Sequence, residues 1–226
     1  MRRLFAVGMA VFWLNAQPLV PLARYLTAET HFQPAEAVSV SDVTPPFSSL
    51  ACGTVVLDVR VSETGEVTDI EVRRAIPSLT ESAVRSVRAW IFEPARLNGQ
   101  AVISRITVAI TFNPASELAA NVPLPPLVPG NDQARSQSSF QPAQVTVAAF
   151  PQYPHGAVPI NATVTLEATV NKAGKMRSAK VLRDVPPFTA KALQAMGDWR
   201  FMPATWDGEP LESKVVLAFC FRQPVT

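Results

Sequence analysis

The sequence is poor in the residues that carry most enzyme chemistry. Its 226 residues include only two cysteines, Cys52 and Cys220, and two histidines, His31 and His155. Two cysteines cannot build a disulfide framework or the paired cysteine spacing of a zinc site. Neither histidine has a recognisable partner, and the G-x-S-x-G, H-E-x-x-H and glycine-rich phosphate-loop motifs are missing. We therefore expect no enzyme, no bound metal and no other cofactor.

An excess of one charge is also missing. The chain has 20 Lys and Arg against 18 Asp and Glu, a formal net charge of +2. Proteins that bind nucleic acids usually present a strongly basic surface. The composition therefore argues against a nucleic-acid partner.

The N-terminal segment indicates export. Arg2 and Arg3 precede an uncharged run from Leu4 to Ala23. A basic start and a short apolar core are typical of a secretory signal peptide, but a run of roughly 20 residues can also cross a bilayer. Residues 1–23 are therefore either a cleaved signal peptide or an anchor in the inner membrane. A third alternative is an N-terminus that is buried or disordered in the cytoplasm.

A pattern of Trp, Phe, Pro and Gly is written twice. Residues 90–99 and 199–208 carry these four residue types at identical spacings, 109 positions apart (199 − 90). Two further pairs share this offset, Gly65 with Gly174 and Phe112 with Phe221. FQPA at 32–35 recurs at 140–143 with a shift of 108. Such regular self-similarity indicates a tandem duplication of about 80 residues per unit.

Each unit has the pattern of a small α+β fold. In the first copy, Val55, Leu57, Val59 and Val61 alternate with Val56, Asp58, Arg60 and Ser62, which predicts a half-buried strand. A turn at Gly65 leads to a second strand near residues 67–73, and a third strand covers 106–112. Between them, Leu79 to Trp90 carries an apolar stripe at the helical period, and Pro94 prevents the helix from continuing. We expect Trp90 and Phe92 to lie in the core.

The domain organisation follows from the duplication. We expect two tandem β-β-α-β units, copy one at 32–114 and copy two at 140–223, joined by a Pro/Ser-rich linker at 115–139. Each would be a three-stranded antiparallel sheet of order 2-1-3, covered on one face by its helix. The third strand of each unit is then expected at a sheet edge.

The ordered set of motifs resembles the C-terminal domain of the TonB family. In copy two, residues 151–154 (PQYP) are similar to the family's Tyr-Pro entry motif, and Trp199, Phe201 and Pro203 to its aromatic-proline block. Copy one matches the same block but has Thr-Pro-Pro at the entry. The resemblance implies a periplasmic, non-enzymatic module linked to TonB-dependent transport and energy transduction. It also implies that the third strand binds an extended peptide of an outer-membrane transporter or other envelope protein.

The partner-binding residues are expected on the third strands and in the entry motif, because an edge strand has unpaired backbone groups to which another strand can add. They are Ile103, Arg105, Thr107, Ala109, Gln152, Tyr153, Pro154, Lys214, Val216 and Ala218.

A structural alternative remains open. The two copies could pair edge to edge or pack on each other, which would make the chain a periplasmic adaptor without energy transduction. Apolar residues on the outer sheet faces, such as Val56, Ala109 and Val216, favour some packing there. For Cys52 and Cys220, both a disulfide between copies and two separate thiols are compatible with the sequence.

Overall fold

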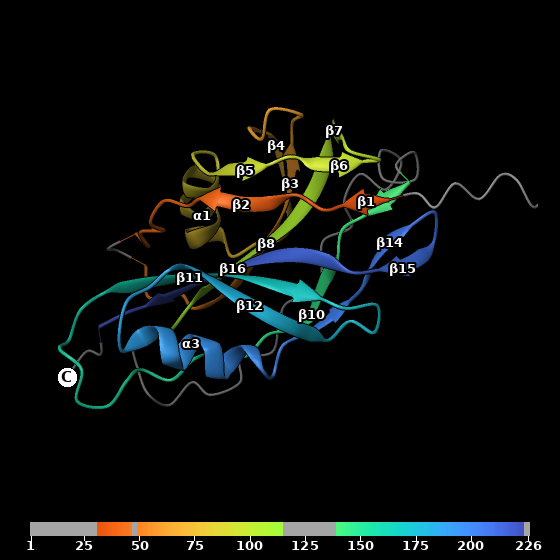
Figure 1. The fold of residues 1–226 in the computed structure, drawn as a ribbon. Helices are drawn as coiled ribbons and strands as arrows, with labels where there is room; N and C mark the ends of the chain where they lie inside the picture. The colour runs from red at the N-terminus through yellow and green to blue at the C-terminus, as the bar shows by residue number, and fades with distance from the viewer. Residues whose placement is uncertain (1–30, 47–48, 115–138, 224–226) are drawn as a thin grey trace, which may run out of the picture. The chain divides into compact units, whose positions relative to one another are not determined.

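The alternating segments of both halves form one six-stranded sheet. Its order is β12-β11-β16-β8-β3-β4 (Figure 1). The strands of the first half are β3 (Gly53–Val61), β4 (Val67–Arg74) and β8 (Ser104–Phe112). Those of the second are β11 (Ala162–Val170), β12 (Met176–Arg183) and β16 (Ser213–Phe221). This computed structural model describes residues 31–46, 49–114 and 139–223, so the predicted segment 1–23 and all but the end of the linker lie outside the described residues.

Strand order within each half agrees with the sequence, but the expected pair of separate three-stranded sheets is wrong. β3 pairs antiparallel with β4 and β8, and β11 pairs antiparallel with β12 and β16. The two third strands then pair with each other in parallel, from Thr107 with Val215 to Phe112 with Cys220. The third strands are therefore the centre of the sheet, and its edges are β4 and β12.

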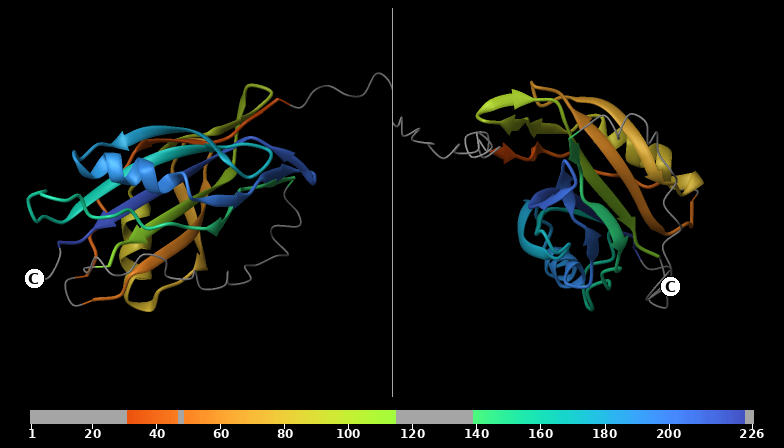
Figure 2. Two further views of the ribbon diagram at one scale, coloured as in Figure 1. Left: turned by 90° about the horizontal axis from the view of Figure 1, so that it is seen from below. Right: turned by 90° about the vertical axis from the view of Figure 1, so that its right-hand side faces the viewer.

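One helix covers each face of this sheet, in agreement with an α+β fold. The buried side chains of α1 (Pro77–Val87) share a core with Val216 and Ala218 of β16. Those of α3 (Phe188–Met196) pack with Val215 and Leu217 of the same strand. Since successive residues of a strand point to opposite faces, the two helices cover opposite faces. The views in Figures 1 and 2 show α1 and α3 on either side of the strands.

Short strands surround the main sheet in two matching sets. β2 (Glu36–Ser39) pairs with β5 (Ile91–Glu93), and β6 (Ala95–Leu97) lies between β1 (Phe32–Gln33) and β7 (Gln100–Val102). The second half repeats this with β10 (Gln144–Val147) on β13 (Arg200–Met202), and with β14 (Ala204–Trp206) between β9 (Phe140–Gln141) and β15 (Glu209–Leu211). The expected extension of the first helix to Trp90 is wrong, because α1 ends at Val87 and β5 begins at Ile91.

The repeated aromatic block closes each half around the hairpin glycine. Trp90 and Phe92 are buried, which confirms their place in the core. The Phe92 amide donates to the Gly65 carbonyl at 2.9 Å, and a Cβ on Gly65 would lie 1.9 Å from the Phe92 oxygen. Phe201 and Gly174 repeat this contact. Only glycine permits so close an approach, which explains why glycine and the aromatic block recur together.

Candidate functional site

The predicted binding strands meet at a junction between the two halves. We define this inter-half junction as β8, β16 and two N-terminal arms. The first arm is residues 31–46 with β1 and β2, and the second arm is residues 139–151 with β9 and β10. Each arm pairs with the aromatic block of its own half and contacts the sheet of the other half through the bonds described below.

The side chains of β8 and β16 cross into the core of the opposite half. Val216, Ala218 and Cys220 are buried in the core formed around α1, although they belong to the second half. Ala109 and Val56 are buried in the core formed around α3. The apolar outer faces noted in the sequence are therefore covered by the other half of the chain.

A buried ion pair fixes the first arm to the second half. The Glu167 side chain on β11 is fully buried, and its Oε2 accepts a hydrogen bond from the Ala37 amide of β2 at 2.7 Å. Lys214 Nζ on β16 lies 3.2 Å from Glu167 Oε1 and 3.4 Å from Glu36 Oε1. Burial alone would lower the pKa of Lys214, but the carboxylates of Glu167 and Glu36 outweigh it and raise that pKa.

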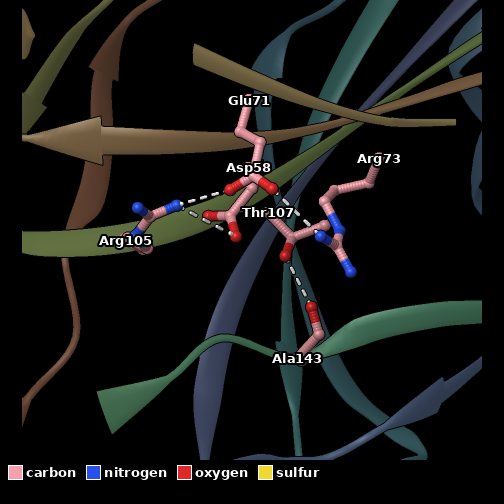
Figure 3. Close-up of polar contacts among 6 residues, drawn as sticks. All are labelled: Asp58, Glu71, Arg73, Arg105, Thr107 and Ala143. Atoms are coloured by element: carbon pink, nitrogen blue, oxygen red, sulfur yellow. Dashed lines mark hydrogen bonds and ion pairs between the residues drawn. The ribbon is translucent and has the colours of Figure 1, made fainter. Parts of the chain in front are cut away.

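At the equivalent place on the first half, a cluster of ion pairs lies beside one hydrogen bond to the second arm (Figure 3). Arg105, 109 positions before Lys214, lies 3.4 Å from Asp58 Oδ2 and 3.0 Å from Glu71 Oε2. Arg73 contacts the other oxygen of Glu71 at 3.0 Å. Thr107 on β8 donates to the backbone carbonyl of Ala143 in the second arm at 2.5 Å. The ion pairs of the two halves thus occupy matching positions with different residue types.

Further bonds join the ends of the arms to the opposite half. Thr163 Oγ1 on β11 donates to the Val43 carbonyl at 3.1 Å. Asn113 Nδ2 donates to the Pro151 carbonyl at 2.6 Å, and its own amide donates to the Cys220 carbonyl at 2.9 Å. Each arm therefore contacts the other half along much of its described length.

The entry motif contributes to the core of its own half. The Tyr153 ring packs edge-on against Phe188 with centroids 5.2 Å apart. Its hydroxyl donates to the Ile160 carbonyl and accepts from the Ile160 amide, each at 3.0 Å. Pro154 is buried and Gln152 is exposed.

The structure therefore places five of the ten predicted binding residues against the other half of the chain. Ala109, Val216 and Ala218 are buried, Thr107 binds the second arm, and Lys214 binds the first arm. Arg105 bonds within its own half, and Ile103 is exposed before β8. The expectation that β8 and β16 present a free edge is wrong, because each lies between two hydrogen-bonded neighbours.

Sequence reasoning missed the carboxylates at this junction. Asp58 and Glu167 stand on β3 and β11, 109 positions apart, at strand positions where a solvated face was expected. A signal was present, because each lies within a strand that is otherwise almost wholly apolar or hydroxyl-bearing. The repeated FQPA motif also marked the two arms, since both copies of its phenylalanine reach the junction.

The two cysteines are separate thiols, Cys52 half-buried and Cys220 buried. Cys220 pairs across β16 and β8 with Phe112, which pairs in turn with Gly53. Cys220 therefore lies two strands away from Gly53, the neighbour of Cys52, and adjacent strands are about 4.8 Å apart. This separation is larger than the Cα–Cα distance of about 4.4–6.8 Å that a disulfide needs. Burial raises the pKa of the Cys220 thiol to about 12. No cluster of metal-ligating side chains occurs in the described residues.

A family model of the Gram-negative bacterial TonB protein C-terminal matches residues 51–114 and 150–222. The chain belongs to this family. The two matched segments correspond to the strands and helices of the two halves described above. A search of curated proteins finds no match.

TonB C-terminal domains are periplasmic and serve envelope transport rather than catalysis, by interacting with outer-membrane transporters or other envelope proteins. Among residues 31–46, 49–114 and 139–223, no helix has the length and apolarity to cross a membrane.

Proposed function

We propose that the two halves are tandem TonB C-terminal units that serve as each other's partner, and that the chain acts as a periplasmic adaptor in envelope transport. The observation that carries this proposal is the parallel pairing of β8 with β16 over six residue pairs. An outside peptide was expected to pair with the backbone of a third strand. The third strand of the other unit occupies that position. The adaptor alternative raised by the sequence therefore explains the geometry better than capture at a third strand.

Separating β8 from β16 would cost a large free energy. A peptide that replaced β16 beside β8 would expose Val216 and Ala218, which are buried in the core around α1. It would also separate Lys214 from Glu36 and disturb the buried Glu167 that holds the first arm. A buried carboxylate that loses its partners is strongly destabilising. We therefore infer that the third strands stay paired while the chain works.

A second candidate is strand addition at the outer borders of the sheet. Within the described residues β12 has a main-sheet neighbour on one side only, and most of its side chains are exposed. Of its basic residues, Arg177 pairs with Glu212 and Arg183 with Asp42, and Lys180 is exposed. An extended segment of an outer-membrane transporter or envelope protein that adds here would place an acidic side chain beside Lys180.

Hydrogen exchange on the full chain tests the proposed function. Amides of residues 107–112 and 215–220 should exchange slowly in the absence of any partner, and the exposed strand β12 provides the internal comparison. Adding an extended peptide from an outer-membrane transporter should leave the third-strand amides unchanged. Fast exchange in β8 or β16 that slows only when the peptide is added would refute the adaptor proposal and restore capture at a third strand. New protection confined to β12 would support the second candidate.

A further inference from the structure

A cleft of about 610 Å³ opens where the first arm meets the second half. One wall is formed by Pro45, Pro46 and Leu50, and Leu50 is 82% exposed. The other wall is formed by the ends of β11, β12 and β16, with Thr163, Arg183 and Arg222 among the lining residues. The cleft therefore combines an apolar rim with a basic interior.

Arg222 is a buried cation for which the structure shows one hydrogen bond from its five N–H donors. Its residue exposure is 8%. Nη1 donates to the Ser49 carbonyl at 2.7 Å, whereas Nε and Nη2 have no hydrogen-bond partner among the described residues. Burying an arginine without a counter-charge costs free energy. In agreement with this, burial lowers the pKa of Arg222.

The two unused nitrogens are the matched pair of the guanidinium. The Nε and Nη2 hydrogens point in parallel from one edge of the plane, which is the arrangement that binds both oxygens of a carboxylate. The bond from Nη1 to the Ser49 carbonyl restrains the guanidinium on its other side. The second lining arginine, Arg183, is neutralised by Asp42 at 2.7 Å, whereas no ion pair to Arg222 occurs in the part of the chain that the structure describes.

We propose that this cleft binds a carboxylate group through the Nε and Nη2 edge of Arg222, with an attached apolar side chain against Pro45, Pro46 and Leu50. The carboxylate belongs to a partner segment that enters the cleft, where Gln223 is a further lining residue. The last β8–β16 pair, Phe112 with Cys220, borders this cleft, so the site needs the junction between the halves but not the adaptor function itself.

NMR on the full ¹⁵N-labelled chain tests the proposal with N-acetylvaline as the probe. N-acetylvalinamide, which lacks the carboxylate, is the matched ligand control. The NMR signals of the Thr163 and Gln223 amides and of the Arg222 Nε–H should shift saturably on addition of N-acetylvaline. The apparent dissociation constant should be at least about tenfold lower for N-acetylvaline than for N-acetylvalinamide. Arg222→Lys keeps the charge but loses the fork and should weaken binding at least about fivefold. Arg177→Lys, at an exposed arginine on β12, should bind as the unchanged chain does.

Saturable shifts with the acid, at a lower concentration than with the amide, would support a carboxylate site. Equal shifts with acid and amide, or saturable binding of neither, would overturn it. The comparison of acid with amide decides this even if Arg222→Lys does not fold.

Discussion

The rings of Phe32 and Phe140 lie with their centroids 4.6 Å apart at the meeting point of the two arms. They are the first residues of the repeated FQPA motif, so equivalent positions of the two halves touch each other. Equivalent residues meet in this way when two like units are related by an approximate two-fold axis. The parallel pairing of β8 with β16 and the opposite placement of α1 and α3 fit the same axis.

Gly65→Ala should destabilise the protein by at least about 2 kcal/mol, because Gly65 has a positive φ of 88° and a Cβ would lie 1.9 Å from the Phe92 carbonyl oxygen. Urea unfolding followed by circular dichroism measures the change. Gly99→Ala is the matched control, since Gly99 has φ of 84° but a Cβ there would have no atom within 4 Å. It should cost only about 1 kcal/mol. Equal losses would show that the contact with Phe92 does not matter.

Lys214→Met should destabilise the folded chain by about 2–4 kcal/mol, because it leaves the buried Glu167 carboxylate without its ammonium partner. Glu167→Gln in the same chain should recover part of the loss. A double-mutant cycle from denaturant unfolding gives the coupling energy. Additive effects of the two substitutions would contradict a coupled pair.

The same ion pair predicts a loss of stability at high pH. The folded pKa of Lys214 is raised above its unfolded value, so its contribution is fully present below the unfolded pKa of about 10.4. It is lost as the pH rises through the folded pKa. The free energy of unfolding of the unchanged chain should therefore fall more steeply above pH 10 than that of Lys214→Met. Parallel pH profiles would exclude this pair as the cause.

The sequence predicts the fold of each half better than it predicts how the two halves join. The 109-residue offset, the alternation in 55–61 and the apolar stripe from Leu79 determine the strands, the helix and their order, because these depend on local periodicity. The end of α1 at Val87 was missed because Trp90 continues the helical spacing while it packs from a turn. The inter-half junction was harder to predict from the sequence. A strand shows the same alternation of side chains whether its outer backbone groups are free or paired with another strand. Only the apolar outer residues, such as Val216, indicated a partner, and they could not show that the partner was the other half.

Cys52 and Cys220 should differ sharply towards thiol reagents. Cys220 is buried and its pKa is raised to about 12, so its thiolate is scarce at neutral pH, whereas Cys52 is only half-buried. Iodoacetamide at pH 8 followed by peptide mass spectrometry should find label on Cys52 first, and on both residues in urea. A peptide pair linked by a Cys52–Cys220 disulfide in the native protein would disagree with the separation described above.

Val216→Ala should weaken the attachment of the second half to the first, although the residue belongs to the second half. Its side chain lies in the core around α1, so its truncation should cost about 1–3 kcal/mol. Val181→Ala is the control, because Val181 is 41% exposed on the edge strand β12 and should cost little. Both are measured by chemical unfolding. A larger effect at Val181 would be incompatible with the described junction.

The most direct test cuts the chain between its halves. A protease site is inserted within residues 115–138 and the protein is digested under native conditions, after which native mass spectrometry measures the association of the two fragments. If β8 and β16 hold the halves together, the fragments remain a one-to-one complex at micromolar concentration, and their third-strand amides stay protected from exchange. Separation into two folded monomers would contradict the claim that each half is the other's partner.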